Sequence, residues 1–261
     1  MLRILKTRRL QKSRTIRYPD GPPPPLPARF AGRPVIRPGA CPEGCAACVQ
    51  ACPTGAIQGR PGGNPTLDMG LCLFCRDCAA ACPSHLIEFT GEYRLAASDR
   101  SRLVIASNSG TTPPPVRSAE AARLFGRSLK LRQVSAGGCN ACEADTNVLG
   151  TIGWDLGRFG IKFVASPRHA DGLLVTGPVS ANMRDALLRT YDAVPEPRVV
   201  IAAGTCAISG GLYRGSPATC GGAAAVLPVD LFIPGCPPHP LTILDALLRF
   251  LGRVEDPSPD S

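Results

Sequence analysis

The sequence has no long apolar run, few histidines and almost no acidic residues near its N-terminus. No stretch approaches the 18 or more apolar residues that a membrane-spanning helix needs, so we expect no transmembrane helix. Thr7-Arg8-Arg9 has the arginine pair of a twin-arginine export signal, but no apolar region follows it, and we expect that the chain is not exported. The histidines, His85, His169 and His239, are isolated from one another, which favours structural roles over metal ligation.

Positive charge is concentrated in the first 38 residues. They contain ten Lys or Arg and a single acid, Asp20, whereas the other basic and acidic residues balance, so this segment accounts for the net charge of +9. Such an arm can bind nucleic acid, anionic lipid or an acidic partner, or remain a solvated tail. No known nucleic-acid-binding module follows, which disfavours nucleic acid. GPPPPLP at 21–27 is expected to be a stiff polyproline II segment, and 1–29 is predicted to be a basic, proline-rich arm.

Thirteen cysteines dominate the rest of the pattern. Between residues 41 and 83 the run C-x2-C-x2-C-x3-C-P occurs twice, with a C-x3-C opening in the first copy. Cys45, Cys48, Cys52 and Pro53 each recur thirty residues later, which indicates an internal duplication. Cysteine-rich chains are often secreted disulfide proteins, but this spacing is typical of an iron–sulfur ligand run and therefore of a reducing compartment.

The two runs predict two [4Fe–4S] clusters, because three thiolates on one loop can reach three corners of a cubane. In two-cluster ferredoxins the last Cys of each run ligates the cluster of the other run. The predicted ligands of the first cluster are Cys41, Cys45, Cys48 and Cys82, and those of the second are Cys72, Cys75, Cys78 and Cys52. Zinc is an alternative, although it usually takes two separated CxxC pairs. Residues 30–100 resemble bacterial-type two-cluster ferredoxins, which implies an α+β ferredoxin domain with short strands at 66–68 and 86–89.

The second half of the chain alternates strand-like and helix-like segments. After a linker at 101–117, Ser118 is a predicted helix N-cap. Strands are expected at 129–135, 162–165, 173–176, 199–203 and 229–233, and helices at 145–158, 183–191 and 241–251, the last of them amphipathic. This alternation favours an α/β domain with a parallel sheet over 118–252. The last residues, 253–261, are expected to be disordered.

Four more cysteines follow strands of this predicted sheet: Cys139, Cys142, Cys206 and Cys236. The C-terminal ends of parallel strands lie at one edge of a sheet, where ligands collect, so we expect a third [4Fe–4S] site there. The neighbouring glycines would let the backbone approach and offer N–H groups to sulfur; they are Gly137, Gly138, Gly204, Gly210 and Gly235. A structural zinc site is the alternative. Cys220 is left over and is predicted to be a plain thiol, and Trp154 to be a core residue.

The motifs GCNACEAD, LLVTGPVSANM, GTCAISGG and IPGCPPHP resemble the small subunit of [NiFe] hydrogenases. They are most similar to the membrane-bound, energy-converting group, such as formate hydrogenlyase, and to the homologous 20 kDa cluster-bearing subunit of complex I. The resemblance implies a flavodoxin-like fold with one [4Fe–4S] cluster. The complex I version has adjacent cysteines at the first position, so the C-x2-C form here favours the hydrogenase side. Glu143 and Asp145 stand where that group commonly has acids near the cluster.

The N-terminal module is similar to the ferredoxin-like subunit of the same complexes, normally a separate chain, so the sequence reads as a fusion. The resemblance implies an electron-transfer subunit of an oxidoreductase complex, without a catalytic centre of its own. Expected partners are a large catalytic subunit, membrane-arm subunits and an external electron donor or acceptor, with the chain peripheral on the cytoplasmic face of the inner membrane. Two alternatives remain: a nickel-free, complex I-like quinone-reducing or hydrogenase-related complex, and a ferredoxin fused to a sensory or scaffold domain.

Overall fold

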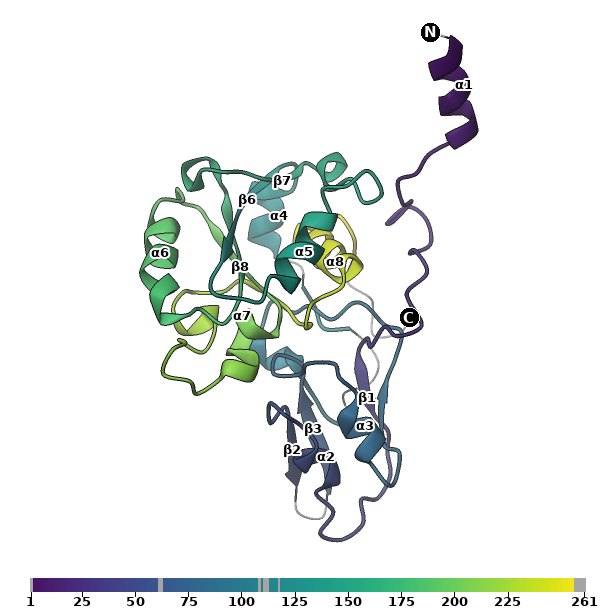
Figure 1. Ribbon diagram of the computed structural model, residues 1–261, viewed down its shortest axis with the longest axis vertical. Helices are drawn as coiled ribbons and strands as arrows, with labels where there is room; N and C mark the ends of the chain where they lie inside the picture. Colours follow the sequence, from purple (N-terminus) through teal and green to yellow (C-terminus); the bar gives the residue numbers. More distant parts are fainter. Residues whose placement is uncertain (1, 61–62, 108, 110–112, 117, 256–261) are drawn as a thin grey trace.

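The computed structural model describes residues 2–60, 63–107, 109, 113–116 and 118–255 (Figure 1). The α-helices are α1 (Leu2–Gln11), α2 (Ala47–Gln50), α3 (Asp77–Ala81), α4 (Ala119–Phe125), α5 (Ala141–Val148), α6 (Ala181–Asp192), α7 (Thr205–Ser209) and α8 (Pro240–Phe250). The strands are β1 (Pro34–Ile36), β2 (Ile57–Arg60), β3 (Gly63–Asp68), β4 (Ile87–Phe89), β5 (Val104–Ile105), β6 (Leu129–Ser135), β7 (Ile161–Phe163), β8 (Gly172–Thr176), β9 (Val199–Ala203) and β10 (Leu231–Ile233). Short 3-10 helices are η1 (Arg100–Leu103), η2 (Leu156–Phe159), η3 (Pro167–His169), η4 (Gly211–Tyr213) and η5 (Ala223–Ala225). Within the described ranges, none of the helices is both long and apolar enough to cross a bilayer.

The N-terminal module contains two small antiparallel sheets, β1–β4 and β2-β3-β5. The strands predicted at 66–68 and 86–89 are confirmed as β3 and β4. The predicted linker differs from expectation, because β5 lies within it and pairs with β3, with Leu67 opposite Ile105. Both of these side chains are buried, so apolar burial holds the first part of the linker against the module.

The second module is built on a five-stranded, all-parallel sheet of order β10-β9-β8-β6-β7. All five predicted strands are present, within two residues of the expected ends. Counted from β6 as the first strand, the order is 2-1-3-4-5. The direction of strand order reverses between β6 and β8, which in open α/β sheets is where ligands bind, outside the carboxyl ends of the strands.

Helices cover both faces of this sheet (Figure 1). Apolar residues of α4 and α8 pack on one face, and those of α6 and α7 pack on the other. The hydrophobic core on the α6 and α7 face is continuous with the core of the N-terminal module, which includes Ile36, Leu67 and Ile105. A backbone pair between Ala97 and Phe232 also joins the two modules beside β10.

Two predicted helices differ from expectation. The helix expected at 145–158 starts at Ala141 and ends at Val148, and η2 follows it. Helix α8 has the predicted amphipathic pattern, but all eleven of its residues are buried, so its polar face is not exposed. Two of its polar residues pair with each other, because the Nε of Arg249 donates to Asp245 Oδ2 at 2.8 Å, and Asp245 Oδ1 also accepts from the hydroxyl of Tyr18 at 2.6 Å.

The N-terminal arm has two parts. Helix α1 has no buried residue and extends away from the body of the molecule (Figure 1). Residues 15–20 instead lie against the second module: Ile16 N donates to Gly153 O at 2.9 Å, and Arg158 donates to the carbonyls of Ile16 and Tyr18. The predicted N-cap is confirmed, since the Ser118 hydroxyl accepts from Ala121 N. The tail predicted to be disordered begins at Arg253, but Arg253 N donates to Leu248 O at 2.8 Å and Val254 packs against the core; residues 256–261 lie outside the described part of the chain.

Candidate metal centres

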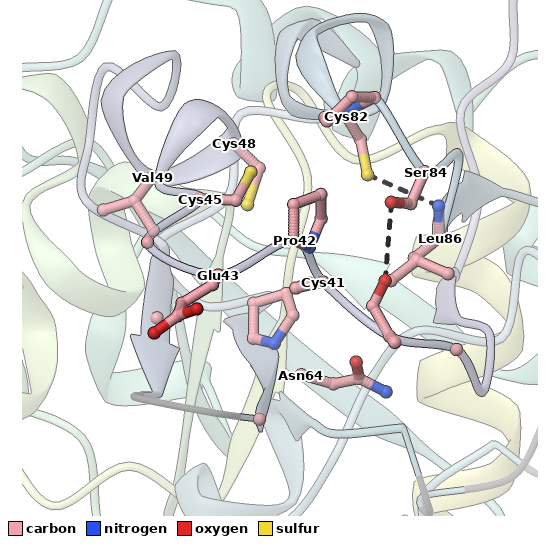
Figure 2. A pocket seen from close by; sticks show the side chains of 17 residues that line it. Cys41, Pro42, Glu43, Cys45, Cys48, Val49, Asn64, Cys82, Ser84 and Leu86 are labelled. Atoms are coloured by element: carbon pink, nitrogen blue, oxygen red, sulfur yellow. Dashed lines mark hydrogen bonds between the residues drawn. The ribbon is translucent and has the colours of Figure 1, made fainter.

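The first set of predicted ligands surrounds an open cavity of about 1090 Å³ in the N-terminal module. Cys45 and Cys48 come from the loop and first turn of α2, Cys41 precedes them, and Cys82 follows α3. Figure 2 shows Cys45 and Cys48 on one side of this cavity and Cys82 on the other. Burial raises the pKa of Cys48, and the neighbouring Cys82 and Cys41 raise it further. The structure therefore brings all four thiols of this set together.

The second set lines a smaller cavity between α3 and the β2–β3 sheet. Cys72, Cys75 and Cys78 approach it from one loop, and Cys52 approaches from the other copy of the duplication. Burial raises the pKa of Cys72 to about 12, and burial with the charges of Cys52 and Cys75 raises that of Cys78 to about 11. These thiols are protonated at neutral pH, so binding a metal through them would release protons.

Backbone N–H groups point at three of the sulfurs. Ala56 N donates to Cys52 Sγ at 3.2 Å, and Phe74 N to Cys72 Sγ at 3.2 Å. Leu86 N donates to Cys82 Sγ at 3.4 Å. Burial alone would raise the pKa of Cys52, but hydrogen bonds from the backbone and side chain of Thr54 and from the Ala56 amide lower it overall. N–H donors of this kind stabilise thiolate charge, as a cluster ligand requires.

The third set lies at the C-terminal edge of the parallel sheet. Cys139 and Cys142 follow β6, Cys206 is in the first turn of α7 after β9, and Cys236 follows β10. Burial raises the pKa of Cys206 to about 11, and the nearby Cys236 and Cys139 contribute. Burial, Glu143 and the other three thiols raise the pKa of Cys142. Four thiols from three separate loops therefore face one region.

Gly204 is required by this arrangement. Its φ is +93°, a conformation that favours glycine, and a Cβ added there would lie 2.5 Å from the Sγ of Cys142. Any side chain would thus displace a predicted ligand. The absence of a side chain keeps the space beside Cys142 open for its sulfur and whatever it binds.

A buried carboxylate adjoins the third set. Glu143 Oε1 accepts hydrogen bonds from the hydroxyls of Ser135 and Thr176, both at 2.6 Å. Burial by itself would raise the pKa of Glu143, but these two donors lower it overall, so the carboxylate stays charged. No such donor to Asp145 is found among the described residues, and burial raises its pKa. Glu143 therefore places a fixed negative charge beside Cys142 and Cys206.

The second and third sets are neighbours across the module boundary. The charge of Cys75 contributes to raising the pKa of Cys236, after burial and Cys139. A cavity of about 320 Å³ beside Cys236 is lined by Leu73 and Phe74 of the second-site loop, by Pro27 and Arg29 of the N-terminal arm, and by Phe30 and Ala31, which follow the arm. The first and second sets are also neighbours, since the charge of Cys48 contributes to raising the pKa of Cys78.

The remaining sequence candidates lie outside the three sets. Cys220 is half-buried and packs against the core, and Trp154 is half-buried beside the imidazole of His239. His239 caps α8 through its Nδ1, which accepts from Leu241 N at 3.1 Å. His85 and His169 are exposed. Sequence reasoning missed the hydroxyls of Ser135 and Thr176, because nothing in a strand's local pattern reveals which distant carboxylate it meets.

The three sets of thiols have the chemistry that [4Fe–4S] clusters require. Each consists of four thiols, and [4Fe–4S] clusters are held by four Cys thiolates. Among the described residues, no three His, Cys, Asp or Glu side chains converge on the position of a single metal ion. The thiolates of a cubane bind four different irons and surround the cluster. The N–H···S hydrogen bonds and the gap at Gly204 suit thiolate ligands.

Comparison with known families agrees with this two-part organisation. Residues 40–87 match the 4Fe-4S dicluster domain, and residues 139–250 match the NADH ubiquinone oxidoreductase, 20 Kd subunit. The chain is 40% identical to the probable membrane-bound hydrogenase subunit mbhJ of Pyrococcus furiosus, over 53% of this chain and 83% of that protein. It is 43% identical to formate hydrogenlyase subunit 7 of Escherichia coli, over 49% of this chain and 51% of that one.

An NADH-quinone oxidoreductase subunit of Desulfovibrio desulfuricans is 46% identical over 43% of this chain and 61% of its own length. The chain thus spans only about half of the formate hydrogenlyase relative but most of the Pyrococcus one. The iron–sulfur character of the N-terminal module and the α/β character of the second are both confirmed. The chain belongs to the family of the NADH ubiquinone oxidoreductase 20 Kd subunit, and a 4Fe-4S dicluster domain precedes its family domain.

Proposed function

We propose that this chain is an electron-transfer subunit that holds three [4Fe–4S] clusters. The proposed ligands are Cys41, Cys45, Cys48 and Cys82 for the first cluster, Cys72, Cys75, Cys78 and Cys52 for the second, and Cys139, Cys142, Cys206 and Cys236 for the third. The observation that carries the proposal is the grouping of twelve of the thirteen cysteines into three sets of four. Each bound cluster would accept and release one electron at a time. The protein contributes burial, N–H···S hydrogen bonds and the spacing of the sites, which together set cluster potentials.

The route we propose starts at the first site and ends at the third. The first cavity is open to solvent, so an external redox partner could approach the first site there. The neighbouring charges of Cys75 and Cys236 support a step between the second and third sites. Cys139 and Cys236 are exposed at the sheet edge, and the exposed Leu212 and Tyr213 follow Cys206. We infer that a large catalytic subunit docks on this edge and exchanges electrons with the third site.

The complex is proposed to be a membrane-bound, energy-converting [NiFe] hydrogenase of the formate hydrogenlyase type. Relatives with such names, mbhJ and formate hydrogenlyase subunit 7, support it. The nickel-free, quinone-reducing alternative is supported by the relative from an NADH-quinone oxidoreductase. Membrane-arm subunits and a position on the cytoplasmic face of the inner membrane belong to the same proposal. The strand order 2-1-3-4-5 supports a flavodoxin-like fold for 118–252.

The test is to purify the tagged chain anaerobically from gently solubilised membranes, with whatever copurifies, and to measure iron and nickel per chain. About twelve irons with near-stoichiometric nickel would support the hydrogenase proposal. The same iron content with a large partner but no nickel would favour the quinone-reducing alternative. About eight irons would refute the third cluster, and a monomer without a large partner would refute the role as a subunit.

The basic arm is proposed to contact the membrane-facing side of the complex. Helix α1 carries Arg3, Lys6, Arg8 and Arg9 and has no buried residue. Deletion should be confined to residues 2–11, because Tyr18 is part of a buried network. The deletion is expected to weaken complex assembly and to leave the iron content unchanged. Undiminished assembly would refute a role for α1 at the membrane.

A further inference from the structure

Helix α7 lies at the boundary between the second and third predicted cluster sites. It begins directly after β9, at the C-terminal edge of the sheet, and carries Cys206 in its first turn. Thr205, the residue before Cys206, is almost fully buried, with 1% of its surface exposed. A polar side chain buried at such a position needs hydrogen-bond partners, and those of Thr205 belong to both sites.

The hydroxyl of Thr205 donates to the carbonyl oxygen of Cys72 at 2.7 Å, and the carbonyl oxygen of Gly235 lies 3.1 Å from it. Cys72 is a predicted ligand of the second cluster. Gly235 precedes Cys236, a predicted ligand of the third, and it also accepts from Thr205 N at 2.9 Å. A single residue therefore connects the backbone of the second site to two ligand loops of the third.

A second hydroxyl reinforces the same contact one turn further along α7. Ser209 Oγ donates to the carbonyl oxygen of Gly70 at 2.7 Å, in the turn that ends at Cys72. That turn is closed by the bond from Cys72 N to Met69 O. Helix α7 thus holds residues 69–72 through two side-chain hydrogen bonds. The partners of these bonds are 133 and 139 residues apart in sequence.

We propose that Thr205 is a positioning residue for electron transfer between the second and third sites: its hydroxyl fixes how far apart, and how rigidly, the two sites are held. This inference rests on the proposed function, since it assumes that both sites hold clusters. Transfer between two centres weakens as their separation grows, so a hydrogen bond between their ligand loops acts directly on that step. Thr205 itself binds no cluster.

The test compares Thr205→Val, which keeps the shape and removes the hydroxyl, with Thr205→Ser, which keeps the hydroxyl. Leaving the buried Cys72 carbonyl without its donor should favour an open junction by about five- to a hundredfold. Thr190→Val is the matched control, because its hydroxyl also donates to a carbonyl, that of Ala186, but within α6 and not between the two modules. Each variant is examined in the anaerobically purified complex, with all clusters reduced for the spectra and starting from the oxidised complex for the rate of reduction.

The decisive readout is the spin–spin splitting between the reduced second and third clusters in electron paramagnetic resonance, measured together with iron per chain. We expect Thr205→Val to lose the splitting and to reduce the third cluster more slowly, with about twelve irons still bound. Thr205→Ser and Thr190→Val should match the wild type. Unchanged splitting and rate in Thr205→Val would overturn the inference. A wild-type complex without a third-cluster signal would instead refute the proposed function.

Discussion

Replacement of Tyr18 by Phe is expected to release the N-terminal arm from the second module. The Tyr18 hydroxyl donates to the buried carboxylate of Asp245 at 2.6 Å, and that carboxylate also accepts from the buried guanidinium of Arg249. Burial and the charge of Asp245 raise the pKa of Tyr18, which favours the protonated phenol that donates this hydrogen bond. Ile16 N also donates to Gly153 O, the Arg158 side chain donates to the carbonyls of Ile16 and Tyr18, and the Thr15 hydroxyl donates to the carbonyl of Ile152.

The size of the effect follows from the chemistry of the lost bond. A hydrogen bond to a charged group contributes about 1.5–3 kcal/mol, which corresponds to roughly a ten- to hundredfold change in an equilibrium. The ring of Tyr18 and its edge-on contact with Tyr93, 6.0 Å between ring centroids, are kept in the Phe variant. Only the stability of docking should change, and the ion pair within α8 should persist.

Hydrogen exchange followed by mass spectrometry would measure this change, because local opening sets the exchange rate of docked amides. Peptides that cover residues 13–24 should exchange roughly ten- to a hundredfold faster in Tyr18→Phe. The control is Tyr213→Phe, since Tyr213 is half-exposed and its hydroxyl has no hydrogen bond in the described part of the chain. Equal exchange of the arm in the wild type and in Tyr18→Phe would show that Asp245 does not hold the arm.

Three further predictions concern the cluster sites. Cys82→Ser should remove the signal of the first cluster and Cys52→Ser that of the second, and each variant should lose about four irons per chain. The control, Cys220→Ser, should keep all the iron. Loss of the same cluster in both variants would contradict the crossed ligand assignment. Glu143→Gln should raise the reduction potential of the third cluster, because the added electron no longer meets a buried negative charge; a potentiometric titration that gives an unchanged or lower value would argue against this. Gly204→Ala should lose the third cluster alone, since its Cβ would occupy the space of the Cys142 sulfur; full iron content would disprove the steric argument.

The cysteine pattern predicted which thiols would meet because its geometry is largely local. A C-x2-C-x2-C run places three thiols on one loop whatever surrounds it, and the duplication indicates where the fourth comes from. The strand-then-cysteine pattern worked for Cys206 and Cys236 for a related reason. Parallel strands end at the same edge, so residues that follow different strands are brought together by topology alone. Neither inference needed the packing of side chains.

The sequence predictions differed from the structure where the packing of side chains determines burial or strand pairing. The amphipathic pattern predicted for α8 would normally leave its polar residues exposed, yet Asp245 and Arg249 are buried as a pair. The sequence does not show that Tyr18, 227 residues away, completes the pair. The predicted linker contributes β5 to a sheet because Leu67 and Ile105 are buried opposite each other.

The sequence by itself determined the three groups of four thiols, the two modules and the parallel sheet, because each depends on spacing or periodicity along a short stretch of chain. Only the tertiary structure decided how the modules face each other, with Thr205 bonded to Cys72 and the arm docked through Tyr18. These contacts join residues more than a hundred positions apart. Their partners are selected by burial and hydrogen-bond satisfaction in the folded state, which leave no periodic signal in the sequence.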